Sequence, residues 1–191
     1  ALQLNTTGEK NIAIGGGALD VSDEEDHNLA IGYDALGGAI AGGEYNVAIG
    51  NYSLDANTSG YKNIAVGYDA LTANTEGNRN TAVGHGSLIA NTTGEYNNAF
   101  GLATLYSNTT GGSNIAIGNG ALLSNTTASY NTAVGFQSLR DANRTADANA
   151  YNTAIGYKAG YTGTNDITTG NYNVLLGAST AASQATATNQ I

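Results

Sequence analysis

The sequence contains no cysteine, methionine, proline or tryptophan, and only 11% of its 191 residues are charged. Without cysteine the chain can form neither disulfide bonds nor thiolate metal sites. Its six Lys and Arg are scattered and its formal net charge is −9, so we expect no nucleic-acid partner. No apolar run approaches the roughly 20 residues of a membrane-spanning helix, so we expect no membrane insertion.

What the chain does have is 27 glycines and an even supply of Ile, Val, Thr and Tyr. Disordered chains are poor in β-branched and aromatic residues and usually carry dense charge. The composition therefore favours a regular, tightly wound β-structure built from small residues.

A short motif, Asn-x-Ala-Ile/Val-Gly, recurs along the chain with a period of seventeen, apart from one step of eighteen and two final steps of twenty-one. A tenth, looser copy begins at Asn173, where Leu175 stands in place of the alanine. The repeated Asn and Gly residues are Asn11 and Gly15, Asn28 and Gly32, Asn46 and Gly50, Asn63 and Gly67, Asn80 and Gly84, Asn97 and Gly101, Asn114 and Gly118, Asn131 and Gly135, and Asn152 and Gly156.

The second half of each repeat is an Ala/Ser-Leu pair followed by a polar turn such as Asn-Thr-Thr-Gly at 91–94. The array covers residues 1–177 as one domain and begins in mid-repeat, so we expect the chain to be part of a longer array. Residues 178–191 lose the pattern and are expected to be a tail or a transition to the next segment. Near that end the Leu position becomes Gly160 and then Ala181, which predicts wider turns and a thinner interior.

A repeat of this length is too short for a pair of helices but suits two short strands and two turns, which is one rung of a solenoid. We therefore predict an all-β fold, a parallel β-solenoid of about ten rungs. With rungs about 4.8 Å apart, the rod would be roughly 48 Å long.

The motif alternates along a strand, so its x and Ile/Val positions share one face and its Ala the other. Neither face carries charge, so we expect both to be covered. One face would line the inside of the coil and pack against Leu36, Leu54, Leu71 and Leu88. The other would be covered by a second copy of the chain. The alternative is a monomer whose alanine face is exposed. Alternation does not decide which face points inward; the larger residues are the predicted core, namely Ile14, Ile31, Ile49, Val66, Val83, Phe100, Ile117, Val134, Ile155 and Leu176.

These repeats resemble the head repeats of trimeric autotransporter adhesins of the YadA type, and more closely the Asn-Thr-Ala-Ile-Gly arrays of phage tail fibres. The resemblance covers about residues 1–177 and departs in period, because adhesin heads use shorter rungs. It implies a left-handed parallel β-roll, a homotrimer, and a place on a virion or in the extracellular space. It also implies that the array is a rigid stalk or head that binds a host-surface receptor, with glycans as a candidate class.

An acidic run replaces the usual turn at Asp20, Asp23, Glu24, Glu25 and Asp26. Clustered carboxylates can bind Ca²⁺, so Asp20, Asp23, Glu24 and Asp26 are a candidate weak cation site. The spacing matches no EF-hand loop, and the favoured interpretation is a solvated acidic loop without a cofactor.

Of the twelve Tyr, five stand just before the repeat Asn, at Tyr45, Tyr96, Tyr130, Tyr151 and Tyr172, and three just after the repeat Gly, at Tyr33, Tyr68 and Tyr157. We expect them to pack across rungs, with sugar binding as the alternative. Five turns match the glycosylation sequon, at Asn5, Asn57, Asn91, Asn108 and Asn125, but their regular placement favours a turn role.

No nucleophile–base–acid set is evident around the two histidines, His27 and His85, so we predict that the protein is not an enzyme. The predicted function is a structural and host-attachment fibre module. A purely structural spacer and an ice- or glycan-binding solenoid are the alternatives.

Overall fold

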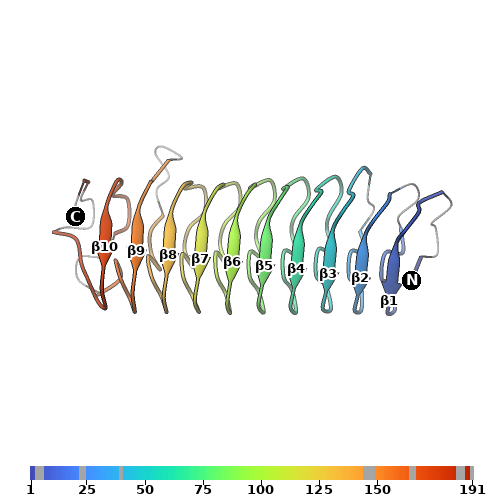
Figure 1. The fold of residues 1–191 in the computed structure, drawn as a ribbon, viewed down its shortest axis with the longest axis horizontal. Coiled ribbons are helices and arrows are strands. Elements are labelled where there is room, and N and C mark those ends of the chain that lie inside the picture. The colour runs from blue at the N-terminus through green and yellow to red at the C-terminus, as the bar shows by residue number, and fades with distance from the viewer. Residues whose placement is uncertain are drawn as a thin grey trace.

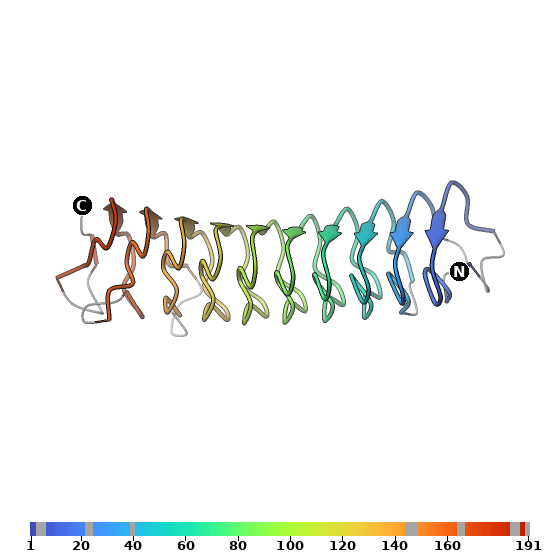
Figure 2. The ribbon, with the colours of Figure 1, turned by 90° about the horizontal axis from the view of Figure 1, so that it is seen from below.

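The computed structural model describes residues 1–2, 7–21, 25–38, 41–143, 149–163, 167–183 and 188–189. Ten three-residue strands follow one another in a row along a rod, with the chain running from one end to the other (Figures 1 and 2). They are β1 (Ile12–Ile14), β2 (Leu29–Ile31), β3 (Val47–Ile49), β4 (Ile64–Val66), β5 (Thr81–Val83), β6 (Asn98–Phe100), β7 (Ile115–Ile117), β8 (Thr132–Val134), β9 (Thr153–Ile155) and β10 (Val174–Leu176).

The ten strands form one parallel sheet in chain order, β1 to β10. Every pairing sets the same repeat position of two rungs side by side: Ile49 lies against Val66, and Val66 against Val83. The predicted all-β parallel β-solenoid is therefore confirmed, and each turn of the coil is one copy of the sequence repeat.

The prediction of two strands in each rung is wrong, because each described rung has one strand and otherwise turns. The cause is left-handed backbone at three repeat positions, seen in one rung at Tyr96 (φ 59°), Ala103 (φ 53°) and Leu105 (φ 50°). Each of these residues donates its N–H to a carbonyl of an adjacent rung at 3.0 Å. The rung thus keeps its inter-rung hydrogen bonds while the backbone bends too sharply for a second strand.

Left-handed backbone costs an ordinary residue about 1–2 kcal/mol, so Ala103→Gly should relieve strain. Glycine also makes the unfolded chain more flexible, which offsets part of this gain. We therefore expect the free energy of unfolding of the variant to exceed that of the original chain by about 0.5–1 kcal/mol. Ala99→Gly, in the adjacent strand β6, should instead be destabilising. Urea unfolding of both variants tests this, and a loss of stability in Ala103→Gly would contradict the backbone assignment.

The inside of the coil is lined by the central alanines of the strands and by the repeat leucines. Ala30, Ala48, Ala65 and their equivalents through Ala154 are fully buried. Leu36, Leu54, Leu71 and Leu88 lie inside as predicted, and all are fully buried. The inward column is alanine because the coil is narrow, and a small residue in each strand leaves room for the leucines.

The predicted core stripe is wrong, because its residues lie on the outside of the sheet. None of its ten members is buried, and Ile14, Phe100, Ile117, Ile155 and Leu176 are exposed in the single chain. The alternative of an exposed alanine face is wrong for the same reason. The residues concerned are Ile14, Ile31, Ile49, Val66, Val83, Phe100, Ile117, Val134, Ile155 and Leu176.

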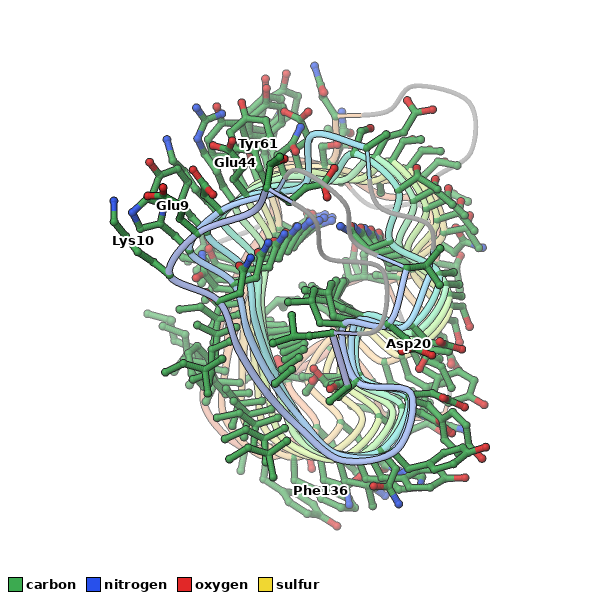
Figure 3. The ribbon with its side chains drawn as sticks, turned by 90° about the vertical axis from the view of Figure 1, so that its right-hand side faces the viewer. Glu9, Lys10, Asp20, Glu44, Tyr61 and Phe136 are labelled. Carbon is green, nitrogen blue, oxygen red and sulfur yellow. The ribbon has the colours of Figure 1, made fainter. Side chains whose placement is uncertain are left out.

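Two columns of asparagine also run through the interior, where rows of side-chain nitrogens follow the coil (Figure 3). In the first column, the Asn97 amide oxygen accepts the Asn114 N–H at 3.1 Å, and its amide nitrogen donates to the Gly111 carbonyl at 2.8 Å. In the second, Asn91 donates to Asn74 at 2.8 Å and Asn108 donates to Asn91 at 2.8 Å. These amides are fully buried, and their bonds tie each strand to its turn and each rung to the next.

The C-terminal end shows how a missing leucine is replaced. A side chain on Gly160 would lie 2.7 Å from Leu139 and 3.3 Å from Leu175, so those two leucines already occupy the space. Ile167, from the longer turn, is fully buried in the same core. The prediction of a thinner interior at Gly160 is wrong, since Leu175 and Ile167 supply the volume that the repeat leucine gives elsewhere.

Candidate functional site

The outer stripe, defined as the first and third residues of strands β1–β10, is the main apolar surface of the chain. Its exposed fractions reach 59% at Ile14 and 63% at Leu176. Only Ile, Leu, Val, Phe, Thr and Asn occur in it, with no charge. In the end-on view, this wall of the coil runs between the corners marked by Lys10 and Phe136 (Figure 3). A continuous uncharged stripe of this length is a surface that another protein surface can cover.

Beside the stripe runs the tyrosine column, defined as the residues just before each repeat Asn. Tyr130 stacks on Tyr151 with ring centroids 4.9 Å apart, and Tyr151 on Tyr172 at 5.1 Å. Elsewhere in the column cations lie beside rings, as where Arg79 is 5.2 Å from the Tyr96 ring centre. The column consists of Lys10, His27, Tyr45, Lys62, Arg79, Tyr96, Ser113, Tyr130, Tyr151 and Tyr172.

A second aromatic row follows the repeat Gly at another corner of the coil. Tyr52 lies edge-on to both Tyr33 and Tyr68, at 5.6 and 5.8 Å, and Tyr68 stacks on His85 at 5.4 Å. Phe136, at the lower corner in Figure 3, stacks on Tyr157. The predicted cross-rung packing of tyrosines is confirmed for these pairs. Because stacked rings cover each other's faces, a ligand reaches mainly their edges.

The turn asparagines that match the glycosylation sequon belong to the interior. Asn57, Asn91, Asn108 and Asn125 are fully buried, and each donates its amide to a carbonyl three residues later at 2.9–3.0 Å. Asn5 lies outside the described residues. The turn role expected for these four is confirmed, since a buried, hydrogen-bonded amide cannot carry a glycan.

The candidate cation site is only partly described, because Asp23 and Glu24 lie outside the described residues. Asp20 lies 3.8 Å from the Ala1 amino group, and Asp26 accepts the Glu9 N–H. Elsewhere, burial raises the pKa of Asp55, and the charges of Asp34 and Asp69 add to the rise. Over the part of the chain that the structure describes, no three acidic or histidine side chains converge on a point that could hold a metal.

The part of the chain that the structure describes has no pocket. His27 stacks on Tyr45 at 4.8 Å and His85 on Tyr68, in separate rows. Within the described ranges, no helix is long and apolar enough to cross a membrane.

The chain matches no protein-family model, no curated protein and no solved structure. Its class follows from its own geometry. The chain is a β-solenoid repeat protein. Its surface features are the outer stripe and the aromatic rows, each of which repeats one residue position from rung to rung.

Sequence reasoning missed the inward asparagine columns, although the signal was present. The repeat Asn and the strand Ala are two residues apart, so they share a face. All ten copies keep the Asn, and five successive turns repeat the second one. A polar residue retained on the alanine face points to a hydrogen-bonded interior column and hence to an inward alanine.

Proposed function

We propose that this solenoid is a structural and attachment segment of an extracellular or virion fibre, assembled as a homotrimer through the outer stripe. The observation that carries the proposal is the uncharged stripe on one wall of a straight coil. Covering it with identical stripes would remove its apolar surface from water along the whole rod. The resemblance to trimeric fibre repeats supports three chains rather than two.

The rod form suits a stalk or head. Each rung bonds only to its neighbours, so further rungs extend the structure without changing its cross-section. Three chains would also present three copies of each surface feature, which raises the avidity of weak receptor contacts. The proposal assigns the protein no catalytic step.

The threonine rows favour this role over ice binding. Thr58, Thr75, Thr92 and Thr109 each donate their hydroxyl to the carbonyl of the next threonine or its equivalent, at 2.9–3.2 Å. These hydroxyls are therefore used within the coil. A spacer without receptor contacts remains the second candidate, since a rigid rod serves either purpose.

Charge placed in the outer stripe should dissociate the assembly. We expect the double variant Val83→Lys, Ile117→Lys to have the mass of a single chain by light scattering, because like charges would meet at the interface. The matched control is His85→Lys, Asn119→Lys, which adds the same charge to the same two rungs outside the stripe and should leave the mass of the assembly unchanged. Equal masses for both variants would count against the stripe as the interface.

Attachment is then tested with the assembled chain and the stripe variant on glycan arrays and host cells. The attachment role predicts binding by the assembled chain and much weaker binding by the single-chain variant. Assembly without binding to any surface would instead support the spacer.

A further inference from the structure

Ser113 is the one member of the tyrosine column that is neither aromatic nor cationic. Tyr96, Ser113 and Tyr130 occupy successive rungs, since Ser113 donates its N–H to Glu95 at 2.8 Å and Tyr130 donates to Gly112 at 3.1 Å. Their φ angles are 59°, 58° and 63°, so the backbone is the same at all three positions. Only the side chain differs: a hydroxymethyl group stands between two rings.

The distance between the rings on either side of Ser113 can be estimated from the stacked tyrosines farther along the same column. There Tyr151 lies between Tyr130 and Tyr172, at 4.9 and 5.1 Å and within 9° of parallel. Tyr96 and Tyr130 are likewise two rungs apart, so their rings lie about 10 Å apart by the strand spacing. The space between them, here called the slot, takes one flat group.

No ring of the described residues stacks between Tyr96 and Tyr130. Among ring pairs of the described residues, Tyr130 pairs only with Tyr151, and Tyr96 pairs with none. Arg79 covers the other face of Tyr96, and its guanidinium donates to the Tyr96 hydroxyl at 2.7 Å. The second aromatic row shows the contrast at Asn51, one of its non-aromatic positions, where Tyr52 lies edge-on to the rings on both sides.

We propose that the slot between Tyr96 and Tyr130 binds the guanidinium group of an arginine side chain from a partner polypeptide. A guanidinium is flat, stacks on aromatic faces and is weakly hydrated. One guanidinium already lies near two rings at this corner of the coil, since Arg79 of the column is 5.0 Å from the ring centre of Tyr61, which lies beside the column, and 5.2 Å from that of Tyr96.

Charge favours a cation over a neutral sugar ring. Glu95 precedes Tyr96 and is only partly buried, and one of its carboxylate oxygens accepts the Asn78 amide at 2.9 Å. A carboxylate can accept further hydrogen bonds, which a guanidinium would donate. The net charge of −9 draws a basic partner and repels an acidic one. The slot lies on a single chain, so the inference does not depend on the fibre role.

The first test titrates the intact chain with acetyl-Gly-Arg-Gly-amide and follows the Ser113 amide by NMR. We expect saturable shifts centred on Ser113, with a Kd on the order of 1–10 mM, as suits one side chain. The citrulline peptide, which is nearly the same shape but neutral, should bind at least tenfold more weakly. Equal binding of both peptides, or shifts with methyl glucoside and none with the arginine peptide, would overturn the proposal.

Two variants locate the site. Ser113→Tyr should fill the slot as Tyr151 does and abolish the shifts, whereas Asn119→Tyr adds a ring in the same rung at the other corner and should leave binding unchanged. Glu95→Gln should weaken binding about threefold, as expected for one exposed charge contact. Unchanged binding by Ser113→Tyr would place the peptide elsewhere and refute the slot.

A second measurement uses no added ligand. Ser113→Arg places a guanidinium in the slot from within the chain, and it should melt at a higher temperature than Ser113→Gln, with a difference that shrinks as salt is added. An Arg variant no more stable than the Gln variant would show that the two rings do not accept a guanidinium.

Discussion

Replacing Asn97 with Asp is expected to lower the free energy of unfolding by about 3–5 kcal/mol, the typical cost of leaving a buried charge without a partner. The Asn97 amide nitrogen donates to the Gly111 carbonyl at 2.8 Å and to the Asn80 amide oxygen at 3.2 Å. A carboxylate cannot donate, so it would place negative oxygen against two acceptors inside the coil. Urea unfolding at pH 7 measures the loss.

The matched control is Asn119→Asp, at an exposed position outside the outer stripe, which should cost well under 1 kcal/mol because water solvates the charge. The pH dependence of the Asn97→Asp variant has a definite sign. Burial would raise the pKa of the introduced carboxyl group above its value in the unfolded chain, so the folded state would bind the proton more tightly. The loss should therefore be greatest above the folded-state pKa and shrink as the pH falls below it. A loss that is the same for both variants would rule out a buried asparagine column.

Replacing Gly84 with Ala is expected to cost at least about 3 kcal/mol, because two unfavourable effects combine. Gly84 has a φ of 134°, a conformation that side chains rarely tolerate. A methyl group would also lie 2.6 Å from the Gly101 carbonyl carbon of the next rung, and backbone on that side cannot move without opening the sheet. Thermal and urea unfolding of the purified variant measure the effect.

Gly86→Ala provides the control within the same rung. Gly86 has a φ of 62°, like Ala103 at the equivalent position of the next rung, and a methyl group there would meet only the Tyr106 ring at 3.5 Å. We expect a cost of about 1 kcal/mol, the ordinary penalty for left-handed backbone. Similar costs for the two variants would mean that the rungs are not in close backbone contact at Gly84.

The repeat period was enough to predict the stacking of the rungs. Copies of so short a motif at a regular step can bury their apolar positions only by lying over one another, which sets Ile49 beside Val66 and Val66 beside Val83. The three longer steps did not disturb this register, since the strands on either side of each step pair at the same repeat positions. The array thus fixes fold class and strand pairing before any coordinates are known.

Side-chain size alone could not predict which face of each strand points into the coil. Alternation separates Ala82 from Val83 but does not say which of them points inward. The narrow coil excludes the larger residue, and its width is set by the turns, where Leu88 and Asn91 take up the interior. The left-handed backbone at Leu88 was also unpredictable, because a leucine seldom adopts it outside a lattice of inter-rung hydrogen bonds.

The contacts in the candidate sites could likewise be predicted from the sequence only in part. Spacing along the chain predicted which tyrosines share a row, because residues at one repeat position must stack. It did not show that Tyr52 lies between Tyr33 and Tyr68, since that depends on side-chain direction.

The central claim is that the outer stripe of this solenoid is covered by further copies of the same chain. The most direct measurement is the mass of the purified 191-residue chain in solution by light scattering. The account predicts a particle of three chains, about three times 19.3 kDa. A stable, soluble particle of 19.3 kDa would contradict it, because the stripe would then face water along its whole length.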